Sequence, residues 1–325
     1  SETHPLLSPE DEFADFELVT EQINAAGDFS EPPGSYARDA LRLGLEFSPS
    51  EGFNPYKFGV IGSSDSHNAS RSVQESQHHG KLPVMDGTAG LRLGEALMLP
   101  DQYLRQRRWG SAGLAAVWAH ENTREAIFDA LVRRETYATS GPRIGLRFFG
   151  GFEYPQDLLS RPQWLETAYR QGVAMGGELV ASGANGAAPA FAIAAGMDPQ
   201  GAQLDRLQII KGWVDAAGVS HERVYDVAAS PGRSRDAAGR FVAVGNSVDI
   251  PTASYRNTIG TPQLSALWRD PDFDPSAEAF YYARAIEIPT PRWSTFDAMK
   301  LGIPAPQPAT LQERAISSAI WYRPD

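Results

Sequence analysis

The chain has 325 residues, of which 42% are apolar and 21% are charged, as in a globular protein with one large domain or two ordinary ones. The net charge of −11 disfavours binding to a nucleic-acid backbone, and the absence of a run of about 18 apolar residues excludes a helical membrane span. The chain contains no cysteine, which excludes disulfides and thiolate ligands, so any metal must be bound by His, Asp or Glu.

The first part of the chain alternates between predicted helices and strands. Four elements are expected there, namely a helix over 36–47, a strand over 58–61, a strand over 113–119 and a helix over 122–134. Leu41 and Leu45 share one face of the first helix, and Ile127, Phe128 and Leu131 are expected to face inward on the second. This order of elements favours an α/β fold for residues 1–143.

The residue pattern of the sequence changes after Ile144. Short β-prone segments are separated there by clusters of Gly, Pro and Asp, and they cover residues 144–149, 190–195, 207–214 and 280–288. This pattern predicts a mainly antiparallel, sandwich-like β region over residues 144–325. The domain boundary is therefore expected near residue 143.

The most informative motif follows the predicted strand at 58–61 and has the sequence Gly62-Ser63-Ser64-Asp65-Ser66-His67-Asn68. Side chains two apart in extended chain point the same way, so Asp65 and His67 are expected to face one pocket. A carboxylate oxygen and a neutral imidazole suit zinc, manganese or iron. The alternative is that Asp65 caps a turn and His67 is an ordinary surface residue.

Three further side chains are candidates for the same chemistry. Glu2 and His4 are two residues apart and would share a face if extended, so they are possible additional metal ligands. The alternative for both is a frayed terminus. Arg143 follows a turn-forming Thr-Ser-Gly-Pro sequence and could clamp an anionic group bidentately, or it could form a structural ion pair.

The sequence resembles a known family. Residues 58–68 are similar to the last metal-binding motif of the polymerase and histidinol phosphatase (PHP) superfamily, and more narrowly to domain-of-unknown-function family 3604 within it. Three other stretches match that narrower family, namely residues 1–5 with 11–17, residues 121–124 with 137–143, and residues 289–294. The resemblance implies that residues 1–143 are part of a distorted β/α barrel.

The resemblance also implies a larger site than this chain carries. The family's early His-x-His motif has no counterpart among the six histidines, so the chain is expected to be the C-terminal portion of a longer protein, or to act with an N-terminal portion as a separate chain. The resemblance makes His79 and Lys81 candidates for substrate contact or proton transfer. They lie in the segment 69–91, which is expected to form a binding loop, and a solvated loop is the alternative.

The resemblance and the motif together predict a divalent-metal hydrolase, with manganese, zinc or iron, that acts on a phosphate ester or a similar small anionic ester. The metal would supply a hydroxide and polarise the ester, and a cationic side chain would neutralise developing charge. The alternative is a non-catalytic binding or scaffold module for a glycan or protein ligand. A periplasmic or secreted location is expected from the resemblance and the missing cysteines, with the cytoplasm as the other possibility.

Overall fold

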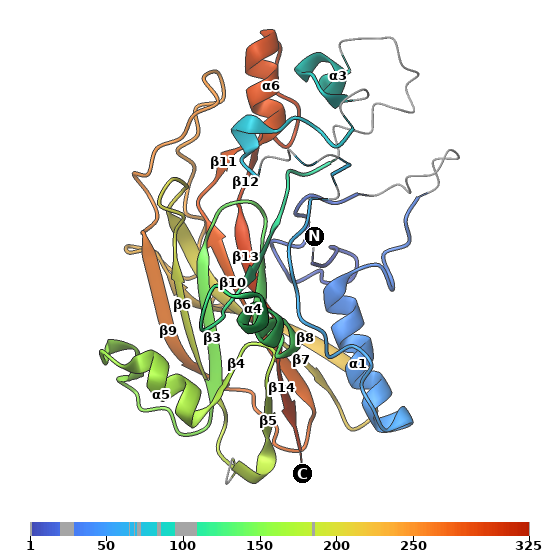
Figure 1. The fold of residues 1–325 in the computed structure, drawn as a ribbon, viewed down its shortest axis with the longest axis vertical. Coiled ribbons are helices and arrows are strands. Elements are labelled where there is room, and N and C mark those ends of the chain that lie inside the picture. The colour runs from blue at the N-terminus through green and yellow to red at the C-terminus, as the bar shows by residue number, and fades with distance from the viewer. Residues whose placement is uncertain are drawn as a thin grey trace.

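The computed structural model describes residues 2–19, 29–64, 66–67, 69, 73–82, 86–94, 109–183 and 186–324. Two β-sheets pack face to face, and helices lie at their periphery (Figure 1). The shared core contains Phe148 and Phe191 from one sheet and Ile209 and Tyr281 from the other, all buried. Packed apolar faces of two sheets make the described chain a β-sandwich.

The larger sheet has eight strands and is organised around its long central strand, β10 (Ala279–Glu287). Strand β10 pairs with β7 along its whole length, with β14 at its start and with β13 near its end, and all three pairings are antiparallel. The β14–β5 pair is parallel. The other strands are β1 (Leu114–Val117), β2 (Thr136–Thr139), β5 (Glu178–Val180), β7 (Leu204–Val214), β8 (Ser220–Ala229), β13 (Arg314–Ser317) and β14 (Ile320–Arg323).

The smaller sheet runs in the order β4-β3-β6-β9, and its pairings are all antiparallel. Its strands are β3 (Gly145–Gly151), β4 (Val173–Ala174), β6 (Ala190–Gly196) and β9 (Gln263–Arg269). A separate short pair joins β11 (Thr290–Pro291) and β12 (Thr310–Leu311). Strands β3, β6, β7 and β10 coincide with the four segments that the sequence predicts to be β-prone, so these strand predictions are confirmed.

The α/β barrel expected for residues 1–143 is wrong. Strands β1 and β2 pair antiparallel, and β2 pairs antiparallel with β13, which places all three in the larger sheet. No closed barrel forms among the residues that the structure describes. Local patterns predicted individual strands, but they do not report that β2 pairs with β13, which lies more than 170 residues later in the chain.

Both predicted helices are present, but the residues predicted to be buried are buried in only one of them. In α1 (Ala37–Glu51), Leu41 and Leu45 are buried against the larger sheet, as predicted. In α4 (Arg124–Val132), Phe128 is 63% exposed and Leu131 47% exposed, so their predicted inward orientation is wrong. The remaining helices are η1 (Glu75–Gln77), α3 (Ala89–Leu93), η3 (Leu158–Ser160), α5 (Trp164–Gln171), η4 (Ala181–Gly183) and α6 (Trp293–Leu301).

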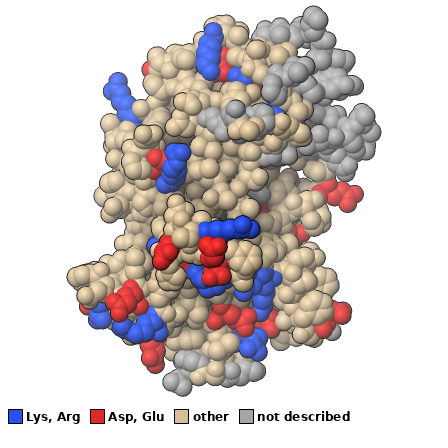
Figure 2. Space-filling view, in the orientation of Figure 1, with Lys and Arg blue, Asp and Glu red and all other residues tan. Residues whose placement is uncertain are grey.

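Helix lengths and surface charge complete the description. Across the described ranges, no helix combines the length and apolar character needed to cross a bilayer. On the face in Figure 2, acidic and basic side chains lie next to one another, for example over α5 at the lower left. One such exposed pair on α5 joins Glu166 and Arg170 across one helical turn at 3.4 Å.

Candidate functional site

The segment that carries the sequence motif runs as extended chain beside the start of β1. The Gly62 amide donates to the Leu114 carbonyl oxygen at 3.1 Å, and the Gly113 amide donates to the Ser63 carbonyl oxygen at 3.0 Å. A Cβ atom on Gly62 would lie 2.5 Å from the Leu114 oxygen and 2.6 Å from the Thr139 oxygen. Glycine is therefore required for this close backbone approach.

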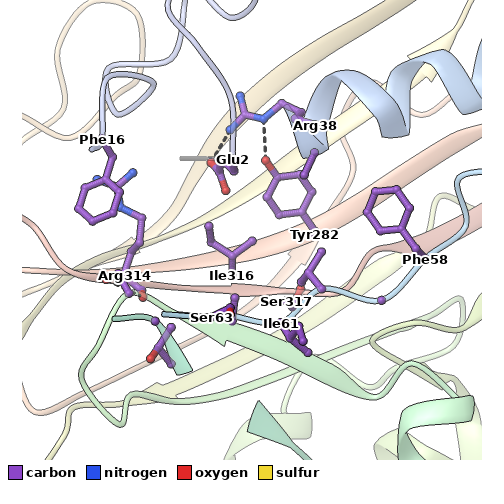
Figure 3. Close-up of a pocket in the computed structure, with 18 of the residues that line it drawn as sticks. Glu2, Phe16, Arg38, Phe58, Ile61, Ser63, Tyr282, Arg314, Ile316 and Ser317 are labelled. Atoms are coloured by element: carbon purple, nitrogen blue, oxygen red, sulfur yellow. Dashed lines mark hydrogen bonds and ion pairs between the residues drawn. The ribbon is translucent and has the colours of Figure 1, made fainter. Parts of the chain in front are cut away.

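A cavity of 460 Å³ opens between this segment, the start of α1 and the larger sheet (Figure 3). In Figure 3, Arg314 and Phe16 lie on one side of the cavity and Arg38 and Tyr282 on the other, with Glu2 between them. Apolar side chains also line it, among them Phe58, Leu41 and Ile316. The cavity thus combines an apolar wall with a few charged groups, as ligand pockets do.

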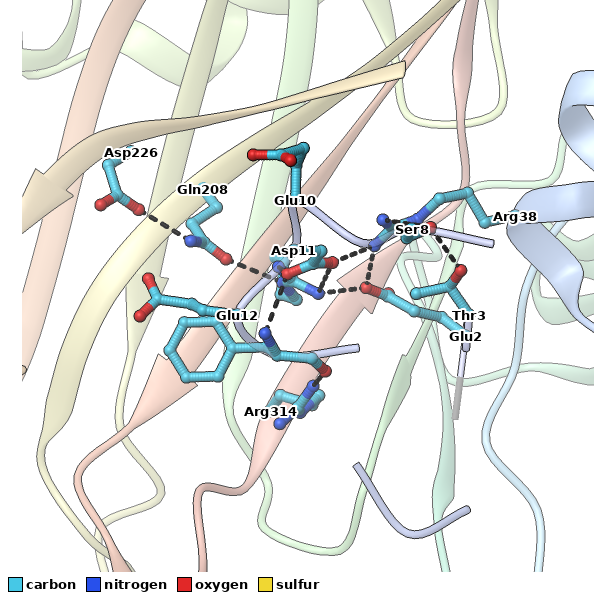
Figure 4. Close-up of polar contacts among 12 residues, drawn as sticks. Glu2, Thr3, Ser8, Glu10, Asp11, Glu12, Arg38, Gln208, Asp226 and Arg314 are labelled. Carbon is cyan, nitrogen blue, oxygen red and sulfur yellow. Dashed lines mark hydrogen bonds and ion pairs between the residues drawn. The ribbon is translucent and has the colours of Figure 1, made fainter. Parts of the chain in front are cut away.

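Glu2 and Arg38 line the cavity and belong to a buried charge cluster, which we define as Glu2, Asp11, Arg38 and Arg284. Figure 4 labels the first three of these residues. Arg38 contacts Glu2 at 2.5 Å and Asp11 at 2.8 Å, and Arg284 contacts Asp11 at 2.7 Å. Arg284 also pairs with Glu2. The cluster joins the N-terminal segment to α1 and to β10 through charge pairs.

The two carboxylates of the charge cluster are ionised at neutral pH. Burial alone would raise the pKa of each, but the guanidinium groups of Arg284 and Arg38 hold the pKa of Glu2 and of Asp11 below the ordinary value. Both arginines donate to Oε1 of Glu2, and its buried Oε2 has no hydrogen-bond partner within the described part of the chain. A metal ion at Glu2 would therefore meet two neighbouring positive charges.

Arg314, at the other side of the cavity, differs from these arginines in its partners. Its guanidinium donates to the carbonyl oxygens of Phe13 and Gln312, and it lies over the Phe16 ring at 3.9 Å. No carboxylate of the described residues lies within ion-pair distance of it. Burial, together with the neighbouring Arg284, lowers the pKa of Arg314 to about 10, so it keeps its charge at pH 7.

The predicted metal ligands are not assembled by the described residues. Asp65 lies outside those residues. The His67 amide donates to the Lys81 carbonyl oxygen at 3.2 Å, whereas Nδ1 of His4 accepts from the Leu6 amide at 3.1 Å. Within the described ranges, no three His, Asp or Glu side chains are grouped so as to hold a metal ion.

The three predicted catalytic residues lie at different places. Nδ1 of His79 is 3.1 Å from the Gln77 carbonyl oxygen, and the Lys81 ammonium lies over the Trp109 ring at 4.8 Å. Arg143 is exposed at a second and smaller cavity. The backbone hydrogen bond from His67 brings Lys81 near the motif. The catalytic roles proposed for His79, Lys81 and Arg143 stay predictions.

Sequence reasoning missed the buried arginines that define the site. Arg284 lies in a strand whose other residues are mainly apolar or aromatic, and it is fully buried. A charged residue in such a strand is the one local signal that could have indicated a buried ion pair. Arg38 gave no such signal, because it lies in an amphipathic helix where a surface position is the ordinary expectation.

Comparison with known proteins gives a family. A family model described as "Protein of unknown function (DUF3604)" matches residues 1–324. No curated protein and no solved structure matches the chain.

Proposed function

The chain belongs to the DUF3604 family, and we propose that it contributes to a metal-dependent hydrolase of the PHP type that acts on a phosphate ester or a similar anionic ester. The observation that carries this proposal is Arg314. It is a buried, charged guanidinium that lines a 460 Å³ cavity and hydrogen-bonds to backbone carbonyl oxygens. An oxyanion is the natural partner of such a group.

The position of the motif also supports the proposal. Phe58, Ile61 and Ser63 line the cavity, and His67 follows four residues later in the sequence. At about 3.8 Å per residue, the Cα atom of His67 is within about 15 Å of that of Ser63. The chain segment that forms this wall of the cavity therefore continues directly into the Asp-x-His motif.

Asp65 and His67 provide oxygen and imidazole donors of the kind that zinc, manganese and iron accept. A bound metal would supply Lewis acidity and a hydroxide nucleophile. The described residues alone do not make a metal site, because Glu2 is held by two guanidinium groups and the other donors lie apart. The role that this chain's residues support is binding: Arg314 would pair with the anionic group, and hydroxyls such as that of Ser63 would donate to it.

The test is calorimetric titration of inorganic phosphate into the wild-type chain and the R314M variant. We expect phosphate binding by the wild type and a loss of at least about tenfold in R314M, since a hydrogen bond to a charged group contributes about 1.5–3 kcal/mol. R170M removes an exposed arginine of α5 and is the matched control. Equal phosphate affinity in R314M and the wild type would refute the anion-binding role.

Two further measurements keep the test informative. Ser63 is exposed, so S63D should fold, and its added charge should abolish phosphate binding by repulsion. D65A should abolish metal-dependent hydrolysis of p-nitrophenyl phosphate by the assembled hydrolase. Unchanged turnover in D65A, or ligand binding that survives metal chelation without any turnover, would instead favour the non-catalytic binding module.

A further inference from the structure

A second cavity, of 180 Å³, lies on the other side of the turn at residues 139–143. Its lining is strongly acidic and contains the four carboxylates of Glu75, Asp198, Glu287 and Glu313. Arg143 is the one cation among the described lining residues, and it is exposed. None of these five side chains lines the larger cavity.

The fold brings the acidic side chains together from separate elements. Glu287 ends β10 and Glu313 precedes β13, and the Glu287 amide donates to the Glu313 carbonyl oxygen at 2.9 Å. Glu75 comes from η1 and accepts from the Trp293 amide at 2.5 Å. Asp198 follows β6 and accepts from the Arg143 amide at 2.8 Å. Three of the carboxylates are thus positioned at the ends of sheet strands, and the fourth is positioned by η1.

Glu287 is the least satisfied of these groups. The residue is 1% exposed, and its carboxylate accepts from the Ala202 amide. The other oxygen, Oε1, is buried at the cavity and has no hydrogen-bond partner among the residues that the structure describes. A buried polar atom without a partner is costly, so Oε1 points to a ligand that donates a hydrogen bond.

A positively charged donor would also relieve the repulsion among the carboxyl groups of the cavity. Burial and the negative charge of Asp198 raise the pKa of Glu287, and burial with the charge of Glu75 raises that of Glu313. Burial and the charge of Glu17 raise the pKa of Glu75 to about 7. Carboxyl groups that disfavour one another's ionisation are relieved by a cation placed among them.

We propose that this cavity binds a small α-amino acid, with its ammonium group donating to Glu287 and Glu313 and its carboxylate paired with Arg143. The guanidinium of Arg143 makes no ion pair with any described residue, so it is open to an anion. Phe296 and Pro291 line the same cavity and offer an apolar wall to the ligand's side chain. A volume of 180 Å³ is below that of drug-sized sites and suits a ligand of this size.

An ammonium group fits the cavity better than a metal ion. The donors do not form a three-ligand metal group within the described residues. An ammonium group instead offers three N–H donors in separate directions, which can reach carboxylates on different elements. The amino-acid proposal is independent of the hydrolase proposal, because the two cavities are lined by different side chains.

The test is calorimetric titration of the chain with L-alanine, methylamine and acetate. L-alanine carries both charges, methylamine only the cation and acetate only the anion. We expect L-alanine to bind, methylamine to bind at least about tenfold more weakly, and acetate not to bind, since each charge-assisted contact contributes about a factor of ten or more. Absence of L-alanine binding in the millimolar range, or acetate binding as tightly as L-alanine, would overturn the proposal.

Variants locate the site. E287Q keeps the side-chain shape, removes the carboxyl group that would pair with the ammonium group and should fold, while R143Q changes an exposed side chain. Each should weaken L-alanine binding by about tenfold or more. E166Q, on the exposed face of α5, is the matched control and should bind as the wild type does. L-alanine binding that E287Q and R143Q leave intact would place the ligand elsewhere and refute this site.

Discussion

Replacement of Asp11 by asparagine isolates the energetic role of the charge cluster. Asp11 accepts from Arg38 at 2.8 Å and from Arg284 at 2.7 and 3.0 Å, and its side chain is 1% exposed. Asparagine keeps the shape but loses the charge, and it turns an amide donor toward guanidinium donors. Removing one partner of a buried ion pair costs about 3–5 kcal/mol, because the opposite charge is left buried without compensation.

The assay is urea unfolding followed by tryptophan fluorescence. D11N should unfold at a clearly lower urea concentration, with an unfolding free energy reduced by about 3–5 kcal/mol. D157N is the control, because Asp157 forms the same kind of pair with Arg161 at 2.6 Å on the surface, and it should leave the midpoint unchanged. A loss below about 1 kcal/mol in D11N would refute the claim that the cluster holds the N-terminal segment in place.

Acidification and a double variant sharpen the same test. The pKa of Asp11 is lowered in the folded state by Arg284 and Arg38, so the stability it contributes is present above its unfolded pKa and is lost as the pH falls below that value. The gap between the wild type and D11N should therefore narrow below about pH 4. In the D11N/R284M double variant the loss should be smaller than the sum of the single losses, because the two groups contact each other.

Two further predictions concern packing and pH. G62A should destabilise the fold by about 1–3 kcal/mol, because its Cβ would lie 2.5 Å from a backbone oxygen. The control is G145A, which should be close to neutral in urea unfolding because no atom lies within 4 Å of its added Cβ. Equal urea midpoints for G62A and the wild type would contradict the close backbone approach. Burial and the charge of Glu17 raise the pKa of Glu75 in the folded state to about 7, so the stability gained from its protonated form is present below its unfolded pKa and is lost as the pH rises toward 7. The E75Q variant should therefore show a flatter fall in urea midpoint between about pH 5 and 7 than the wild type, and parallel pH profiles would show that Glu75 does not titrate there.

Local patterns in the sequence predicted individual elements well. The Leu41 and Leu45 stripe identified a real helix face, and the β-prone segments coincide with β3, β6, β7 and β10. These predictions depend on near neighbours in the chain, whose periodicity is a property of helices and strands themselves. The same kind of reasoning found a helix after Thr123, whose hydroxyl accepts from the Ala126 amide.

The assembly of those elements could not be predicted in the same way. The strand predicted over 113–119 contributed to the α/β prediction, but β1 pairs antiparallel with β2, a segment for which no strand was predicted. The apolar residues Phe128 and Leu131 have helical spacing, yet spacing does not say which surface covers them. The partners of Arg284 could not be predicted from local hydropathy either, because its carboxylates lie more than 270 positions away in the chain.

The turn at residues 139–143 is a wall shared by both cavities. Thr139 and Ser140 line the larger one, while Arg143 lines the smaller one. Its two ends are held by hydrogen bonds, from the Ser140 hydroxyl to Glu313 and from the Arg143 amide to Asp198. A ligand that binds Glu313 or Arg143 in the smaller cavity would therefore contact the same turn that lines the larger cavity. Thermodynamic linkage makes any such coupling reciprocal, so each ligand would alter the affinity for the other by the same factor.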